Sequence, residues 1–357
     1  MNLKPKTIGI AGTAKNTGKT TTTIALINHF YGRGVILGLT SIGYDGEFVD
    51  NVTGLPKPRL FVPTGMLIVT ADKCLEAGTA KIKVLEHLDI NTPLGRLACG
   101  VVEREGLVVT AGPNQTRHLK DVRDWLIAHG AQLSIIDGAL NRIAPMVATD
   151  GLILATGAAY KADSAAIAQG VHYLAAMCRY KEPNPGLVPG EALTGNHSTA
   201  WDKDGNIIWQ GSPSLFTENQ LAGLVETAAK LKGFLCPGLI TTACLRALKE
   251  MPLAGGSVFV FADPVKPIVG CDWVLTHEFL TKLEEIHAKV AYLNPLPLLA
   301  VTVNPFYPQF RYEANVYEPA FIDDEKLQQR VQEMAEVPVF DIVKQNCAGL
   351  AELIWQE

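Results

Sequence analysis

The chain has 357 residues, of which 48% are hydrophobic and 19% charged, and its formal net charge is −5. An acidic balance without a run of Lys and Arg argues against nucleic acid as a main partner. The apolar segments are short and interrupted by glycine, proline or charge, so we predict no membrane span.

The seven cysteines are scattered along the chain and form no C-x-x-C pair or Cys/His cluster. This spacing is typical of reduced thiols and predicts neither disulfides nor a cysteine metal site. The first six residues are polar and lead directly into an apolar segment, so no signal peptide is predicted. We therefore expect a cytoplasmic protein.

A predicted strand at residues 7–11 leads through a glycine-containing turn into a predicted helix. This order is typical of a phosphate-binding loop (P-loop), in which backbone N–H groups and the helix dipole surround polyphosphate oxygens. Lys19 would reach the β- and γ-phosphates, and the Thr20 hydroxyl would hold Mg²⁺. The predicted ligand is therefore a nucleoside triphosphate with Mg²⁺, bound by Gly12, Thr13, Ala14, Lys15, Asn16, Thr17, Gly18, Lys19, Thr20 and Thr21.

The helix after this loop is predicted to bury Ile24, Ile27 and Tyr31, and residues 35–40 form the next buried strand. Three acids follow in one loop: Asp45, Glu47 and Asp50. One of them could position a water or a co-substrate, or complete the Mg²⁺ shell, and we single out Asp45 for both roles. A solvated acidic loop without a function is the alternative.

Residues 57–65 and 66–70 are predicted to form two short strands that meet at a turn, and residues 117–129 a helix. The apolar strand at 133–136 ends in Asp137 beside a glycine. This arrangement is typical of a Walker B acid, a carboxylate that binds Mg²⁺ beside the first loop. The alternative is an aspartate that caps the following turn.

Another βα turn is predicted between the strand at 151–157 and the helix at 164–177. Lys161 in this turn, and Arg142 after Asp137, are candidate anion ligands, although such a turn is more often only a tight connection. Prolines and glycines between 182 and 190 indicate a domain edge. Beyond it we predict a hairpin at 199–209 with packed tryptophans, helices at 221–231 and 241–249, and a strand at 257–262.

The last predicted core strand, residues 298–303, is followed by Asn304 and Pro305. An amide at this place can pair with the adenine edge through one donor and one acceptor. A turn-forming Asn before Pro is the alternative. The aromatic stretch 306–312 is either an interface or part of the core, and a helix at 325–335 and an edge strand at 337–340 close the chain.

The loop, with Gly12 one residue before the usual first glycine, resembles that of dethiobiotin synthetases and their relatives in the SIMIBI branch of P-loop proteins. The segment 134–139 is similar to theirs as well, with Asp137 in place of Glu and Leu140-Asn141 in place of Gly-Gly. The resemblance implies ATP and Mg²⁺ as ligands, adenine reading by Asn304 and a homodimer. MinD-type members carry a second lysine at the position of Ala14, so the chain departs from that subgroup.

The pattern predicts a doubly wound α/β fold with a mostly parallel sheet and a small α/β insertion. Residues 1–182 form the first part of the nucleotide-binding core, residues 183–272 the insertion, and residues 273–357 the second part of the core.

Taken whole, the chain is similar to the small subunit of lysine 5,6-aminomutase reactivases, in residues 12–20, 40–47 and 57–59. This resemblance implies an ATPase that drives the exchange of damaged cobalamin from a partner enzyme. Its partner would be a cobalamin-dependent aminomutase or a larger reactivase subunit. The alternative is a ligase or small-molecule kinase like dethiobiotin synthetase, which passes the γ-phosphoryl group to a substrate bound near Asp45 and Asp137.

Overall fold

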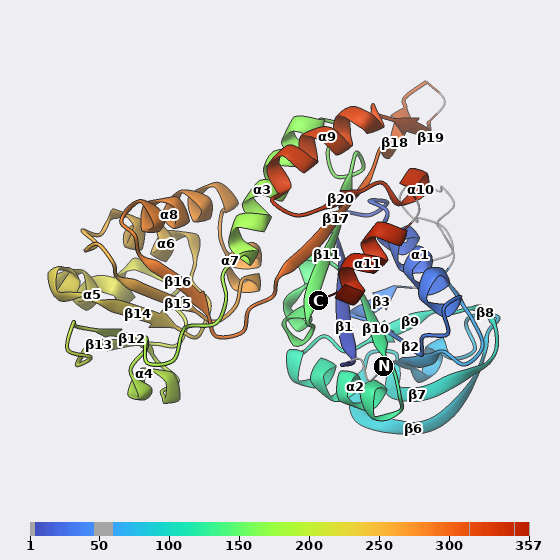
Figure 1. The fold of residues 1–357 in the computed structure, drawn as a ribbon, viewed down its shortest axis with the longest axis horizontal. Helices are drawn as coiled ribbons and strands as arrows, with labels where there is room; N and C mark the ends of the chain where they lie inside the picture. Colours follow the sequence, from blue (N-terminus) through green and yellow to red (C-terminus); the bar gives the residue numbers. More distant parts are fainter. Residues whose placement is uncertain (1–3, 46–59, 314, 346, 357) are drawn as a thin grey trace. The chain divides into compact units, whose positions relative to one another are not determined.

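The computed structural model describes residues 4–45, 60–313, 315–345 and 347–356. The chain folds into two compact units, described separately below (Figure 1). Unit 1 comprises Met1–Val171 and Leu298–Glu357, and unit 2 comprises His172–Pro297. Unit 2 extends past both predicted ends of the insertion. Its last strand, β16 (Lys289–Tyr292), pairs with β15 (Val258–Phe261), which places residues 273–297 in unit 2.

Unit 1 is built on a nine-stranded sheet with the strand order β20-β17-β11-β1-β10-β2-β5-β7-β6. The strands from β20 to β5 are parallel, and β7 and β6 add an antiparallel edge. This order confirms the predicted α/β fold with a mostly parallel sheet. The strands are β1 (Lys6–Gly12), β2 (Leu37–Ser41), β5 (Leu67–Ala71), β6 (Lys81–Thr92), β7 (Gly95–Arg104), β10 (Leu133–Ala139), β11 (Gly151–Gly157), β17 (Leu298–Asn304) and β20 (Val339–Phe340).

Helices cover both faces of this sheet, which is why its central strands are apolar throughout rather than alternating. On one face, α1 (Lys19–Tyr31) and α11 (Ala348–Gln356) contribute to one hydrophobic cluster with β1, β2 and β10. On the other face lies α2 (Thr116–Ala128): a Cβ added at Gly38 would lie 3.0 Å from a methyl carbon of Leu126. Successive residues of a strand point to opposite faces, so the sheet is doubly wound. The remaining longer helices of this unit are α9 (Asp324–Ala335) and the first half of α3 (Ser164–Cys178).

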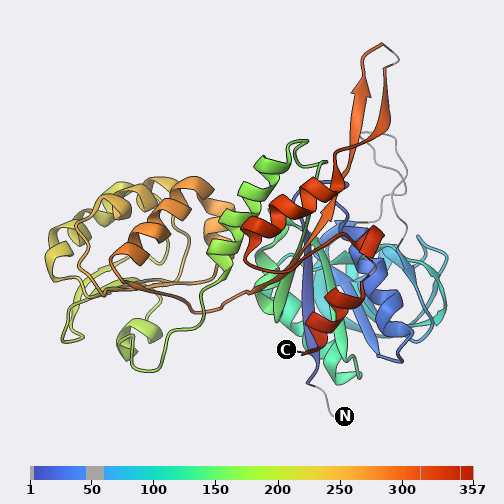
Figure 2. The ribbon, with the colours of Figure 1, turned by 45° about the horizontal axis from the view of Figure 1, so that its top comes forward.

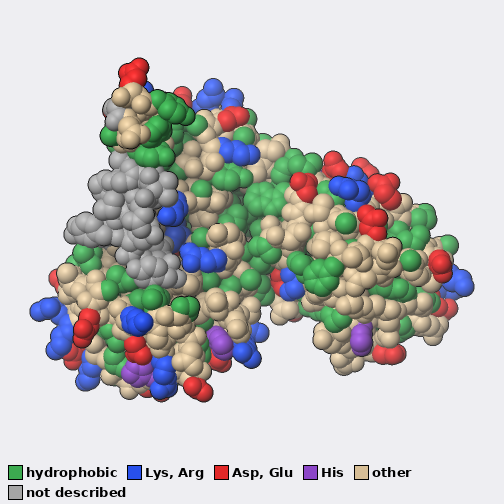
Figure 3. Space-filling view, turned by 180° about the vertical axis from the view of Figure 1, so that it is seen from behind, with side chains coloured by type: hydrophobic (Ala, Val, Ile, Leu, Met, Phe, Trp, Pro, Cys, Tyr) green, Lys and Arg blue, Asp and Glu red, His purple; other side chains and the backbone are tan. Residues whose placement is uncertain are grey.

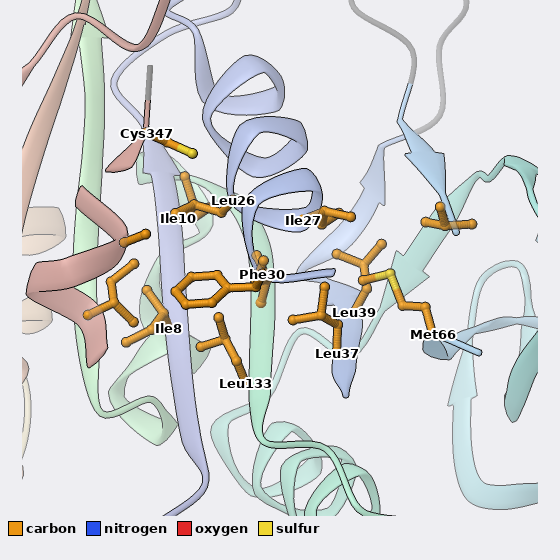
Figure 4. Close-up of a cluster of buried hydrophobic side chains, with 14 of the residues drawn as sticks. Ile8, Ile10, Leu26, Ile27, Phe30, Leu37, Leu39, Met66, Leu133 and Cys347 are labelled. Atoms are coloured by element: carbon orange, nitrogen blue, oxygen red, sulfur yellow. The ribbon is translucent and has the colours of Figure 1, made fainter. Parts of the chain in front are cut away.

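The cluster beneath α1 is the main core at the centre of the sheet (Figure 4). Leu26, Ile27 and Phe30 from α1 lie in one cluster with Ile8 of β1 and Leu133 of β10, and the Phe30 ring lies close to both of these residues. All five are at most 3% exposed, so the packing of α1 on the sheet excludes water. This packing fixes the start of α1 at the end of β1.

Two antiparallel hairpins of unit 1 were not predicted. One is β6–β7, and the other is β18 (Phe306–Arg311) with β19 (Val316–Phe321), which projects from the unit (Figure 2). The aromatic stretch 306–312 is thus not part of the core: its rings pair across the hairpin, and Tyr312 at the tip is 88% exposed. Its role as an interface stays a prediction. Hydrophobic side chains gather on this hairpin in Figure 3.

Two short strands joined by a turn are confirmed within 57–65 and 66–70, and each pairs with a strand elsewhere in the chain. Residues 57–59 lie outside the described residues. β4 (Phe61–Val62) pairs with β8 (Gly106–Leu107), whereas β5 joins the main sheet beside β2. The apolar run of β5 is buried on both faces of the sheet, which a two-stranded hairpin could not provide.

Unit 2 is a smaller α/β body with a five-stranded sheet in the order β13-β12-β14-β15-β16. The predicted hairpin is confirmed by the antiparallel pairing of its first two strands, and Trp201 is buried as expected. β14, β15 and β16 are parallel and follow one another across the sheet. The elements are α4 (Gly190–Thr194), β12 (Ser198–Trp201), β13 (Ile207–Gly211), α5 (Ala222–Thr227), β14 (Gly233–Cys236), α6 (Thr242–Glu250), β15, α7 (Val265–Gly270), α8 (Trp273–Glu285) and β16.

Surface charge of both signs is interspersed on the face of each unit shown in Figure 3. Among the described helices, none combines the length and the apolar content that crossing a membrane requires.

We predict that Phe30→Ala lowers the free energy of unfolding of unit 1 by about 3–5 kcal/mol, since it empties a closely packed site. Phe30 is 3% exposed and its ring centroid lies 5.3 Å from that of Trp355. The neighbouring Tyr31, 44% exposed on the same helix, provides the control Tyr31→Ala, for which we expect a change within about 0.5 kcal/mol. Urea unfolding measures both, and equal losses would contradict the assigned orientation of α1.

Candidate functional site

The loop between β1 and α1 begins with two hydrogen bonds to the neighbouring strand β11. The Thr13 N–H donates to the carbonyl of Ala155 in β11 at 3.0 Å, and the Thr13 hydroxyl donates to the Thr156 hydroxyl at 3.0 Å. Thr156 lies in the predicted strand 151–157, and its hydroxyl anchors the loop. A glycine in place of Thr13 could not make the hydrogen bond to the Thr156 hydroxyl.

The loop then closes on itself through two left-handed residues. Asn16 has φ 64° and Gly18 has φ 95°, a conformation that disfavours residues with a Cβ and is tolerated best by Gly and Asn. The Thr17 hydroxyl donates to the Ala14 carbonyl at 2.9 Å across the turn. Gly18 is also the N-cap of α1, where no side chain accepts from the first-turn amides and no acid lies in the first turn. The helix start therefore presents N–H groups and a positive dipole end that suit an anion.

Lys19 and Asp137 form an ion pair beside this loop. The Lys19 Nζ lies 2.6 Å from the Asp137 Oδ2, and the two side chains are 14% and 5% exposed. The contact exists because β1 and β10 are parallel neighbours in a register that pairs Ile10 with Asp137. The two residues, 118 positions apart in the sequence, thus meet at the carboxyl ends of the parallel strands.

Thr20 lies in the first turn of α1 and is half-buried. Within the described part of the chain, its hydroxyl makes no hydrogen bond, whereas the hydroxyls of Thr22 and Thr23 donate to the carbonyls of Gly18 and Lys19. A hydroxyl and a carboxylate oxygen, supplied by Thr20 and Asp137, are ligands that Mg²⁺ accepts. The residues present therefore fit a magnesium ion at the loop.

Asn304, the predicted reader of adenine, contacts the loop itself. Its Nδ2 donates to the Asn16 carbonyl at 2.9 Å, and its Oδ1 accepts from the Phe306 N–H at 3.1 Å. A Cβ added at Gly18 would lie 3.3 Å from the Asn304 Cβ. In this structure the amide supports the left-handed turn of the loop, and its role in base recognition stays a prediction.

The remaining candidate residues are the acids of the loop after β2, Arg142 and Lys161. Asp45 is the last residue of β3 (Gly43–Asp45), which pairs with β9 (Thr110–Gly112), but its side chain, like Glu47 and Asp50, lies outside what the structure describes. Arg142 packs its guanidinium on β3: a Cβ added at Gly43 would lie 2.7 Å from Nη1. Lys161 lies over the Tyr160 ring, 5.4 Å from its centroid.

Sequence reasoning missed the threonines that hold α1 in place. The Thr22 hydroxyl lies 3.0 Å from that of Thr302 on β17, and both side chains are buried. The signal was the run of four threonines at 20–23, because hydroxyls in an otherwise apolar helix face need partners. These contacts fix the helix start beside Asn304.

No family model matches the chain, and no curated protein matches it. Among solved structures, the signal recognition particle receptor FtsY from Elizabethkingia anophelis is 9% identical, with a TM-score of 0.22, and the match covers 92% of this chain and 65% of FtsY. The pNOB8 ParA bound to nonspecific DNA is 12% identical, with a TM-score of 0.26, and the match covers 63% of this chain and 74% of ParA. Likeness at this level carries no argument, so the fold class rests on the strand order itself.

We predict that Gly18→Ala destabilises unit 1 more than Gly34→Ala. Both glycines are left-handed, with φ 95° and 74°, so each alanine costs about 1–2 kcal/mol in backbone strain. Only Gly18 has a neighbour within 4 Å, the Asn304 side chain, whereas a Cβ at Gly34 meets nothing. Urea unfolding of the two variants measures the difference, and an equal loss would show that Asn304 does not crowd the loop.

Proposed function

We propose that the chain binds a magnesium–nucleoside triphosphate at residues 12–21 and hydrolyses it. The observation that carries this proposal is the Lys19–Asp137 pair at the start of an uncapped helix. A cation, an acid, a half-buried hydroxyl and free helix-start amides gather at one place, and together they complement a triphosphate and its metal ion.

Binding would exchange one ion pair for two others. Lys19 would leave Asp137 and donate to the β- and γ-phosphate oxygens, while the main-chain amides of the loop and Lys15 beside them hold the remaining oxygens. Asp137 and Thr20 would hold the metal, which when bound neutralises charge on the phosphates. Because Asp137 is only 4% exposed, an acid left without a cation there would be costly, which favours this coupled exchange.

In hydrolysis, water adds to the γ-phosphorus, the bond to the β–γ bridging oxygen breaks, and the products are nucleoside diphosphate and phosphate. The chain's part is to align water, phosphate and cation and to stabilise the leaving oxygen through Lys19. Asp45 is the proposed residue that positions the water. It ends β3, and Ile42 just before this strand donates its N–H to the Asp137 carbonyl. ATP is the proposed nucleotide, on the resemblance of Asn304 to the adenine-reading Asn of dethiobiotin synthetases.

For the role of this turnover we propose an accessory ATPase that acts on a cobalamin-dependent aminomutase, alone or with a larger reactivase subunit. Its support is the sequence similarity in residues 12–20, 40–47 and 57–59 and the presence of unit 2 in the same chain as unit 1. The ligase or kinase alternative is less well supported, because Leu140-Asn141 replaces the Gly-Gly that follows the acid in dethiobiotin synthetases.

We predict that Lys19→Ala lowers the affinity for Mg-ATP at least a hundredfold, as measured by isothermal titration calorimetry, because the loop loses the ammonium group that would donate to the β- and γ-phosphates. Lys120→Ala, an exposed lysine on α2, is the control and should bind as the unmodified chain does. Since Lys19→Ala also leaves the buried Asp137 carboxylate without this lysine, the fold itself could be weakened. The double variant Lys19→Met with Asp137→Asn removes both charges and tests binding without this destabilisation. ATP affinity retained in the double variant would refute the assignment.

The two roles differ in what stimulates turnover. We expect a slow basal release of phosphate from ATP that rises when a cobalamin-dependent aminomutase is added, and that is absent from the double variant. Affinity isolation from native lysate, with and without a non-hydrolysable ATP analogue, tests the partner: the aminomutase should be recovered in one nucleotide state only. Turnover that stays at background until a small carboxylate is supplied would support the ligase instead.

A further inference from the structure

Unit 2 contains a pocket at the carboxyl ends of its three parallel strands. Ile240 follows β14, and Phe261 and Tyr292 end β15 and β16. Leu245 of α6 and Phe279 and Leu280 of α8 complete the apolar walls. The volume of the pocket is about 30 Å³, room for about two waters or the end of a narrow chain.

The place of this pocket is the one at which open α/β sheets bind ligands. Carboxyl ends of parallel strands end in loops that can diverge and leave a crevice, and binding pockets there combine apolar walls with a few polar groups. The pocket is therefore at a topological position suited to a ligand.

Tyr292 is the polar residue of the pocket lining whose hydroxyl is available to a ligand. Its side chain lines the pocket, the residue is 1% exposed, and its hydroxyl makes no hydrogen bond to any described residue. Burial raises the pKa of this phenol well above its ordinary value, so the hydroxyl keeps its proton. A hydroxyl that has no hydrogen bond within the described chain can pair with a ligand oxygen.

The other polar side chains around the pocket are already paired within the chain. The Lys266 Nζ lies 2.5 Å from the Asp263 Oδ2, and the Thr276 hydroxyl donates to the Asp272 carbonyl at 2.7 Å. The Cys271 thiol donates to the Ile240 carbonyl at 2.9 Å. The lysine charge is neutralised by Asp263, so the pocket offers no net charge to a ligand, and an ion in it would lose its hydration without a counter-ion.

We propose that this pocket binds a small, uncharged, mainly aliphatic molecule or group that carries one hydroxyl or carbonyl oxygen. The apolar end would lie between Phe261, Phe279 and Leu280, and the oxygen would pair with the Tyr292 hydroxyl. The site is formed by unit 2 alone and needs no nucleotide, so it stands or falls independently of the triphosphate site.

Three probes with the same four-carbon chain test the chemistry: 1-butanol, butyrate and butylammonium. Each is titrated into the full chain without nucleotide, and amide shifts of residues 240, 261, 280 and 292 are followed by NMR. We expect saturable shifts with 1-butanol, at millimolar concentration for so small a probe, and at least tenfold weaker binding of both ions. Absence of saturable shifts with all three probes, or tighter binding of an ion, would overturn the proposal.

Two variants and a control locate the probe. Tyr292→Phe keeps the ring and should weaken 1-butanol binding about three- to tenfold through the lost hydrogen bond. Leu280→Trp should fill the pocket and abolish the shifts, with circular dichroism as the check that the variant folds. Tyr173→Phe, a half-buried tyrosine on α3 that does not line the pocket, should bind 1-butanol unchanged. Equal affinity in Tyr292→Phe and in the unmodified chain would refute the role of the hydroxyl.

Discussion

The candidate site of unit 1 is centred on one ion pair, Lys19 with Asp137, held at the carboxyl ends of the parallel strands. Two ions that are 14% and 5% exposed have given up most of their hydration, which their attraction offsets only when the geometry is close. The pair lies where β1 ends, so the register of β1 against β10 decides whether it can form. A slip of one residue would turn Asp137 to the opposite face of the sheet. The core beneath α1 is what prevents such a slip.

That core and the loop constrain each other. Leu26, Ile27 and Phe30 bury α1 on the sheet, which places its first turn at the end of β1. The loop then has to join a strand and a helix whose positions are already fixed, and it does so with the left-handed residues Asn16 and Gly18. Its amides are therefore turned inward by the connection itself, because no side chain caps the helix.

The sequence allowed the centre of unit 1 to be predicted because each signal there is local. A strand, a glycine turn and a helix start lie next to one another in the chain, and an apolar run that ends in Asp137 needs no long-range information. The β18–β19 hairpin was missed since Pro308 and Pro319, which face each other across it, argue against a strand. β6 carries a strand signal, apolar residues at 82, 84, 88 and 90, that was overlooked. The first boundary of unit 2 falls inside the continuous helix α3, where composition gives no sign of it, whereas Pro295 and Pro297 mark the second.

For Asn304, the role predicted from its place in the sequence differs from the role that its hydrogen bonds indicate. Its place after a core strand and before proline fits base recognition, and nothing in that pattern indicates what the amide touches. In the folded chain its Nδ2 supports the Asn16 carbonyl, and its Oδ1 holds the first N–H of the β18–β19 hairpin. The loop between β1 and α1 and the root of an exposed aromatic hairpin thus share one side chain. A rearrangement of the loop around a triphosphate would have to keep or break the bond to Asn16, so the loop and the hairpin are not independent parts of unit 1.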